Sequence, residues 1–358
     1  MRFRALIAAT CMAATAARAS SSITDEVAGN STQSSASNPR AGSIGDSLHL
    51  NLELDPHWSL NASAMLTFEG DAAGTHNEFG TSSSSVALFS LGADFLLSEH
   101  WTFGASIAGS PRSTLFAGTS FVGLNDRGVN VPVHALIQSA TSEASGTLDF
   151  AYDTAGESDL EWSFGGAATF THLDTSQMVT EARFFKETRI LTPAEVKAAC
   201  NRGGPLCVRG LLTALDETPA SLDSQRLSAN ATATLDRDTD VTLTVDWYHY
   251  DQDPAEIGFF SLVEAGHAGL GVPIAPLHYL VKPEVQHRFG DFSLRFWVQA
   301  GRYAQGTGQS TAGAGARAQY RLNRSFRVWL TITGQNDVDE SGESTKSGGL
   351  ALGVGYRW

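Results

Sequence analysis

Cysteine is scarce in this chain, which contains only three among its 358 residues. Cys11 lies near the start, so the rest of the chain has only Cys200 and Cys207, in the segment CNRGGPLC. An even pair at short spacing is typical of a disulfide in an exported protein. A metal pair would need further ligands, and no other Cys and no His occurs within ten residues on either side. We therefore predict a disulfide between Cys200 and Cys207 and no metal site.

Long apolar runs are also missing. No segment reaches the ~20 consecutive apolar residues that a membrane-spanning helix requires. The start of the chain instead has a basic segment (1–4), a short apolar stretch (5–16) and the cleavage-like triplet Ala17-Arg18-Ala19. These features predict a signal peptide over residues 1–19 and an exported mature protein. Cys11 is not preceded by a lipobox-like Leu-x-Gly, which argues against a lipoprotein.

Basic residues are outnumbered. The chain has 24 Lys and Arg against 38 Asp and Glu, for a formal charge of −14. The predicted signal peptide contains arginines and no acidic residue, so its cleavage would make the mature chain still more acidic. Nucleic-acid binding depends on neutralising phosphates with Lys and Arg, so we expect no nucleic-acid partner. No G-x-S-x-G, H-E-x-x-H or phosphate-loop motif occurs, and we expect neither an enzyme nor a cofactor.

What the chain does have is two-residue alternation, most clearly at its end. In the closing segment GGLALGVGYRW, apolar residues occupy every second position up to Tyr356 and Trp358. This ending resembles the closing strand of Gram-negative outer-membrane β-barrels, in which a terminal aromatic residue helps the insertion machinery to recognise the protein. The resemblance implies an outer-membrane location, with Tyr356 and Trp358 as the insertion signal. It also implies contacts with outer-membrane lipid and lipopolysaccharide, but no particular oligomeric state.

The same alternation recurs in hairpins along the chain. Each apolar strand ends in two or three polar residues, and an aromatic residue such as Trp58 or Trp101 then opens the next strand. Short polar turns beside aromatic residues are typical of the periplasmic rim of a membrane barrel. We count 13 clear strands, with further candidates at 131–137 and around 114–121. Because bacterial barrels use even numbers, we predict an all-β, antiparallel up-and-down transmembrane β-barrel of about 14 strands (12–16).

The domain organisation follows from composition. Residues 20–47 are rich in Ser, Asn and Thr without clear alternation, and they predict a flexible lead-in to a barrel over residues 48–358. Longer connections alternate with the short turns and are expected to be extracellular loops. The longest, 172–225, contains both cysteines and a capped helix at 192–199, with Thr192 as the N-cap. We expect this loop to cap the barrel mouth or to fold into the lumen.

The inward faces of the strands carry the candidate functional residues. In the first half, the inward acidic residues are Glu53, Asp94, Asp149 and Glu161. In the last third, the inward charged residues are Lys282, Glu284, Arg288, Arg295, Arg317, Arg321, Arg327 and Arg357. In a closed barrel this pattern predicts an acidic wall opposite a basic wall, a transverse field that orients polar solutes in a water-filled pore. Trp297 and Trp329 also fall on the inward parity, either as lumen residues or because a bulge shifts the register.

The porin-like pattern favours passive passage of small polar solutes. Polymer export is an alternative, because the segment from Asp291 to Trp358 is similar to polysaccharide-export barrels in its turn RLNRSF and its closing strand. Two further alternatives are a barrel-embedded hydrolase and a structural surface protein. The segment DWYHYD (246–251) is similar to the Asp/His sites of outer-membrane proteases, but its alternation places Asp246 inward and His249 outward beside Trp247. A rim position is the simpler interpretation.

The disulfide is directly testable. Mass spectrometry of protein taken from the cell envelope and digested without reductant should show the peptides of Cys200 and Cys207 joined, because the export pathway leads to an oxidising compartment. Two free thiols in that sample would refute the pairing.

Overall fold

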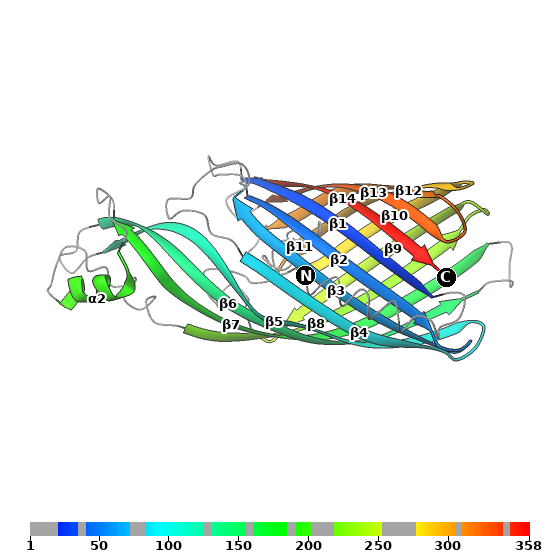
Figure 1. The fold of residues 1–358 in the computed structure, drawn as a ribbon, viewed down its shortest axis with the longest axis horizontal. Coiled ribbons are helices and arrows are strands. Elements are labelled where there is room, and N and C mark those ends of the chain that lie inside the picture. Colours follow the sequence, from blue (N-terminus) through cyan, green and yellow to red (C-terminus); the bar gives the residue numbers. More distant parts are fainter. Residues whose placement is uncertain are drawn as a thin grey trace.

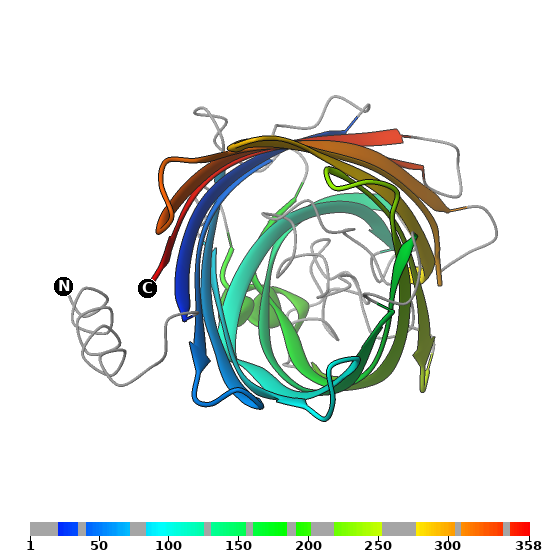
Figure 2. The same cartoon turned by 90° about the vertical axis from the view of Figure 1, so that its right-hand side faces the viewer.

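The chain folds into one closed antiparallel β-barrel in a computed structural model. The structure describes residues 21–34, 41–71, 84–124, 130–154, 160–184, 191–201, 218–252, 277–304, 309–338 and 344–358. The strands follow one another around the barrel in chain order, and β1 closes the ring by pairing with β14. Figure 1 shows the barrel from the side, and Figure 2 shows the ring nearly end-on, with β1 in blue beside β14 in red.

The fourteen strands confirm the predicted fold class and strand number. Their bounds are β1 Ser22–Ser34, β2 Ala41–Glu53, β3 Trp58–Asp71, β4 Ser84–Leu96, β5 Trp101–Leu124, β6 Asn130–Asp153, β7 Glu161–Phe184, β8 Thr218–Thr234, β9 Thr239–Tyr250, β10 Leu277–Phe289, β11 Phe292–Tyr303, β12 Ser310–Arg321, β13 Phe326–Val338 and β14 Ser344–Arg357. The described residues also include one helix, α2 (Pro193–Asn201). Within the described part of the chain, no helix is long and apolar enough to cross a membrane.

The predicted flexible lead-in at 20–47 is wrong, and so is the barrel start at residue 48. The 13 strands counted from the sequence correspond to β2–β14, and the fourteenth is β1, inside the supposed lead-in. The candidates at 131–137 and 114–121 belong instead to β6 and β5. Alternation was hard to recognise in β1 because Asp25 shares the outward face with Ile23 and Val27. Pairing with neighbours on both sides places this polar segment in the sheet.

A side-chain network spans the closing seam. The β1–β14 ladder runs without a break from Ser22↔Arg357 to Ser34↔Thr345. On its inner side, Glu26 of β1 accepts hydrogen bonds from Trp329 Nε1 of β13 and from Arg317 Nη2 of β12, the latter at 2.9 Å. Both side chains must cross β14 to reach Glu26. Gly353 allows this, because a Cβ there would overlap the Trp329 ring.

Short turns and aromatic residues mark the periplasmic end. Four turns begin with a side-chain oxygen that accepts backbone hydrogen bonds two or three residues later: Asp55, Ser98, Asp236 and Asn323. This device is the Asx or Ser/Thr turn. In one of them, the backbone N–H of Asp238 lowers the pKa of the Asp236 carboxyl. The two-residue turn between β10 and β11 uses Gly290 at φ +64°.

Aromatic contacts follow the same rim. The ring centroids of Trp101 and Tyr152 are 4.8 Å apart, and those of Phe326 and Tyr356 are 4.7 Å apart. Trp358 stacks on Tyr356 at 5.8 Å, and its backbone N–H donates to the Ser21 carbonyl. The terminal aromatic pair therefore lies in the rim beside the start of β1. Its role as an insertion signal stays a prediction.

Strands β5, β6 and β7 are each 24 residues long and continue far beyond the barrel. A transmembrane strand needs only ~9–11 residues. The expected loop over 172–225 is thus partly wrong, because residues 172–184 and 218–225 are strand. Figure 1 shows the extension, with α2 at its tip. At the tip, Val133, Phe184 and Val196 are buried.

The helix was predicted at 192–199, and the structure places α2 within two residues of that range. The Glu195 carboxylate accepts a hydrogen bond from the Thr192 backbone N–H at 2.9 Å, which is half of the expected capping box. Cys200 lies in the last turn of α2, whereas Cys207 lies outside the described residues. The disulfide between them stays a prediction.

The seam network predicts a specific sensitivity of the closing strand. Changing Gly353 to Ala should lower the unfolding free energy by about 1–3 kcal/mol, because the new methyl group displaces Trp329 from Glu26. This loss of stability is measured by the midpoint of heat or urea unfolding, followed as the disappearance of the folded band on a gel of unboiled samples. Gly348→Ala in the same strand is the control, since its Cβ would meet only the Thr333 carbonyl at 3.8 Å. Equal midpoints for the two variants would contradict the role of the network.

Candidate functional site: the barrel lumen

The two faces of the wall differ in chemistry. Large apolar side chains point outward and are highly exposed on the isolated chain, among them Ile107 (67%), Leu148 (64%), Leu227 (62%) and Trp247 (60%). On β7 the outward apolar positions run from Trp162 to Phe170, a nine-residue stretch that matches the thickness of a bilayer core. We call these outward apolar side chains the outer belt. The faces turned the other way line the lumen.

The predicted acidic residues differ in their surroundings. Asp94 accepts hydrogen bonds from Ser59 (3.2 Å) and Asn61 (2.5 Å) on the neighbouring β3. The Asp149 carboxylate lies over Gly104 of β5, where a Cβ would overlap its oxygens. Glu161 is exposed at the periplasmic start of β7. Glu53 ends β2, two strands from β14, so it lies near the basic strands rather than opposite them.

The predicted basic wall does not have a single sign of charge. Glu284 lies within 3.3 Å of Arg295 and 3.9 Å of Lys282. Arg288 pairs with Asp240 at 2.5 Å, and Arg317 pairs with Glu26 at 2.9 Å. Glu26 was missed because β1 was not recognised as a strand. Local pairing offsets much of the transverse field that the sequence predicted.

Other predicted basic residues lie nearer the periplasmic rim. Arg321 and Arg357 are exposed at the ends of β12 and β14. Arg327 stacks on Trp329 with its guanidinium carbon 5.7 Å from the ring centroid. It forms no ion pair with any acidic residue in the described ranges. Arg327 therefore contributes a positive charge that no described neighbour offsets.

Trp297 and Trp329 line the lumen without any register shift. The pairings of β11 with β12, of β12 with β13 and of β13 with β14 are continuous at these positions. Each tryptophan lies over a glycine of the next strand, Trp297 over Gly315 and Trp329 over Gly353. An aromatic ring that covers a strand glycine replaces the packing that the glycine lacks. The bulge alternative is excluded at both positions.

A further ion pair, which the sequence did not predict, lies higher in the lumen. Arg226 of β8 donates two hydrogen bonds to Asp246 of β9, at 2.9 and 3.1 Å, and its guanidinium lies over the Tyr248 ring. Asp246 is buried, while Trp247 and His249 on alternate positions point outward. The parity inferred for this segment is thus confirmed. The sequence around Asp246 contains no sign that Arg226, on another strand, would be its partner.

Above this pair, the inward face becomes apolar at the extracellular end of β7–β11. We call this group the apolar band, and its members are Leu173, Leu222, Tyr248, Leu277, Leu280 and Tyr303. Leu173 and Leu222 face each other across β7 and β8. Leu277, Leu280 and Tyr303 are buried against one another, with Tyr248 packed beside them. The Tyr303 hydroxyl donates to Asp337 at 2.5 Å, which fixes the ring.

Comparisons with known proteins identify the architecture. No family model and no curated protein matches this chain. A Pseudomonas aeruginosa FadL homologue aligns over 94% of this chain and 90% of its own, with a TM-score of 0.55 and 10% identity. The CymD monoaromatic hydrocarbon channel aligns over 95% and 89%, with a TM-score of 0.55 and 10% identity. The Ralstonia pickettii toluene transporter TbuX aligns over 95% and 90%, with a TM-score of 0.53 and 12% identity.

These similarities concern the fold. Together with the outer belt and the aromatic rim, they identify the protein as a Gram-negative outer-membrane β-barrel of 14 strands. In its fold, the barrel is similar to those of the FadL homologue and the CymD channel, and these comparisons do not support the expected porin-like character or the likeness to polysaccharide exporters.

The charge pairing predicts how ion selectivity responds to substitution. In planar-bilayer recording, Arg327→Gln should shift the reversal potential towards cation selectivity, because it removes a positive charge that no described acid offsets. The double variant Glu26→Gln/Arg317→Gln removes one charge of each sign, so the reversal potential should change little. A larger shift for the double variant would contradict this account of the lumen field.

Proposed function

We propose that the protein is an outer-membrane channel for small, largely apolar compounds, including monoaromatic ones. The observation that carries the proposal is the apolar band at the extracellular end of the lumen wall. Leu222 and Leu280 are largely buried in the structure, and Tyr248 packs beside Leu280, so a solute seated at this end would be enclosed by apolar side chains. Transfer of apolar surface from water to such a lining is favourable by roughly 25 cal/mol per Å².

The aromatic side chains give the band a preference for flat rings. Tyr303 is buried and Tyr248 is partly buried in this band, so a solute seated there would pack against their rings. Aromatic pairs in offset or edge-to-face contact add about 0.5–1.5 kcal/mol beyond area burial. Both rings are held in place, Tyr303 by Asp337 and Tyr248 beneath the Arg226 guanidinium. Fixed aromatic surfaces lose little conformational entropy when a solute binds.

The lower lumen would then serve as the route of release. Ser, Thr and Asn side chains bond one another across strands here, as in Thr147–Thr169 (2.9 Å) and Thr232–Thr242 (2.8 Å). These partnered groups bind apolar solutes weakly, so a compound leaving the apolar band finds no second strong site. A channel needs binding that is strong enough for entry and weak enough for exit.

The names of the structural neighbours point to the same solute class. CymD is described as a monoaromatic hydrocarbon channel and TbuX as a toluene transporter. At 10–12% identity, that likeness supports the choice of compounds to test and does not by itself establish what this chain carries. The proposal includes no catalytic step.

Small polar solutes remain the second candidate, because hydroxyl, amide and charged side chains line the lower lumen. The two candidate functions differ in how strongly each depends on the apolar band. Polar solutes would gain nothing from Leu222 and Leu280, whereas apolar solutes depend on them. Substitution in the band therefore separates the two functions.

Uptake by intact cells tests the proposal. Cells that produce the protein should take up labelled toluene several-fold faster than cells without it, because the lipopolysaccharide leaflet otherwise slows apolar compounds. Leu222→Asn and Leu280→Asn should each reduce this rate, since a polar amide replaces apolar lining. Sugar permeation into proteoliposomes should be unaffected by the same variants.

Ser145→Asn, on an inward position of β6 outside the apolar band, serves as the control and should leave toluene uptake unchanged. All variants are compared at equal amounts of folded, heat-modifiable protein. Toluene uptake that does not depend on the protein, with rapid sugar permeation, would favour the polar channel instead.

A further inference from the structure

The outer face of the barrel changes character at one level on strands β5–β8. On β7 the outer belt ends at Phe170, and the next outward residues are His172, Asp174 and Ser176. On β8 the outward sequence passes from Leu227 to Asp223. His172 links the two strands, with Nδ1 2.6 Å from Asp223 and Nε2 3.3 Å from Asp174. Because an apolar band on a membrane barrel ends at the bilayer surface, we expect the headgroups of the outer leaflet at this level.

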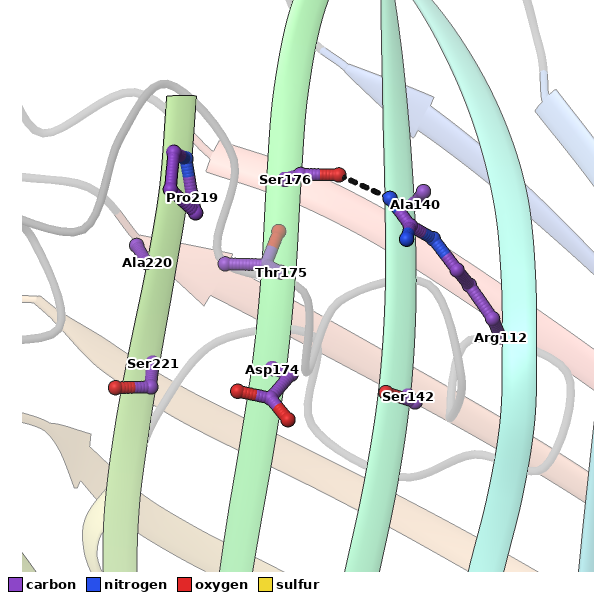
Figure 3. Close-up of a pocket in the computed structure, with 9 residues that line it drawn as sticks. All are labelled: Arg112, Ala140, Ser142, Asp174, Thr175, Ser176, Pro219, Ala220 and Ser221. Carbon is purple, nitrogen blue, oxygen red and sulfur yellow. Dashed lines mark hydrogen bonds between the residues drawn. The ribbon is translucent and has the colours of Figure 1, made fainter. Parts of the chain in front are cut away.

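A polar pocket of about 480 Å³ lies directly above this boundary. Its lining includes Arg112 of β5, Ser142 of β6, Asp174 and Ser176 of β7, and Ser221 of β8. Figure 3 shows Arg112 extending from β5 across β6 to Ser176, where its Nη2 donates to the hydroxyl at 2.7 Å. Small Ala140 on β6 leaves the space for this crossing.

A β-bulge sets the position of Arg112. The β5–β6 register shifts between Ser110 and Ser113, which leaves Pro111 and Arg112 outside the regular ladder. Proline has no backbone N–H to give to a ladder, and bulges commonly redirect a side chain. β4 pairs with β5 only up to Gly109, so the bulge also marks the point where β5 leaves the barrel.

An apolar groove of about 550 Å³ lies below the pocket in the outer belt, on strands β3–β7, and shares β5, β6 and β7 with the pocket. Leu60, Leu91, Ile107, Leu148 and Phe170 form its sides. Its floor includes Gly146, where a Cβ would meet no atom within 4 Å. On β7, Asp174 in the pocket lies four positions after Phe170 in the groove, or about 13 Å along an extended strand.

We propose that the groove and the pocket together bind one sugar-headed lipid of the outer leaflet, with an acyl chain in the groove and the headgroup in the pocket. The groove is continuous with the surface that already faces lipid, which fixes the direction of the chain. The mixed lining of the pocket fits a hydroxyl-rich headgroup. Carboxylates and serine oxygens accept from sugar hydroxyls, and a guanidinium donates to hydroxyl or phosphate oxygens.

The charges in the pocket argue against a simple anionic headgroup. Asp174 lines the pocket, and Asp223 is adjacent through His172, so negative charge accompanies the single guanidinium of Arg112. A phosphate without sugar hydroxyls would meet this repulsion without the compensating hydrogen bonds. A sugar-headed lipid uses both kinds of group.

Native mass spectrometry of the purified full-length barrel in detergent tests the site, with lipid A added as the probe. We expect bound lipid A on the wild type, and a several-fold lower bound fraction for Arg112→Gln, Asp174→Asn and Gly146→Leu. The first two change the pocket, and the third fills the groove without a clash in the folded chain. Phosphatidylglycerol, which has acyl chains and no sugar, should bind much less than lipid A.

Matched controls lie on the opposite part of the outer face. Gly334 on β13 is also outward, and a Cβ at this position would likewise meet no atom within 4 Å, so Gly334→Leu adds the same bulk elsewhere. Arg302→Gln removes an exposed arginine beyond the belt on β11. Both controls should retain bound lipid A at the wild-type level.

Three results would overturn the proposal. Equal binding of lipid A to all variants would show that neither the pocket nor the groove holds it. Equal losses in the control variants would show general adhesion to the outer belt. Binding of phosphatidylglycerol equal to that of lipid A would show that the pocket does not recognise the sugar headgroup. Asp174 is exposed, so loss of binding in Asp174→Asn with an unchanged heat-modifiable band cannot be attributed to unfolding.

Discussion

The closed ladder between β1 and β14 is the constraint on which the rest of the structure depends. An open sheet would leave unpaired backbone groups in lipid, where each costs several kcal/mol. The first strand of the chain, which has an acid on its outer face, is held in place by pairing on both sides. Inside the lumen, Glu26 strengthens this closure through Trp329 and Arg317 across the glycine of β14.

The same seam shapes the electrostatics of the lumen. Because Glu26 lies beside the basic strands, it offsets Arg317, and Glu284 does the same for Arg295. The wall that the sequence predicted to be basic therefore has paired charges of both signs. With that field weakened, the most distinctive part of the inward surface is the apolar band near the extracellular end, and the proposed solute class rests on it.

The long strands β5–β8 give the barrel a second functional surface. Two of them, β7 and β8, contribute Leu173 and Leu222 to the apolar band, and the extension beyond the barrel leads to α2 (Figure 1). On their outer face, the bulge at Pro111 brings Arg112 over Ala140 to Ser176, just where the outer belt ends. In the two proposals made above, neighbouring strands thus face solute on the inside and lipid headgroups on the outside.

The sequence by itself determined the barrel class, thirteen of the fourteen strands, the periplasmic turns and the inward parity of the charged residues. These features depend on two-residue alternation and on turn chemistry, which are local and therefore visible in the chain. The helix at Thr192 was visible for the same reason, because its cap lies within four residues.

The tertiary structure alone decided which charges meet and where the barrel begins. Glu26 and Arg317 are separated by 291 residues and meet only because the ring closes, so no local pattern connects them. β1 was missed because Asp25 interrupts its apolar face, and pairing with β2 and β14 is what makes it a strand. The groove, the pocket and the apolar band likewise combine residues from several strands, and strand register, which is set by the closed ladder, brings them together.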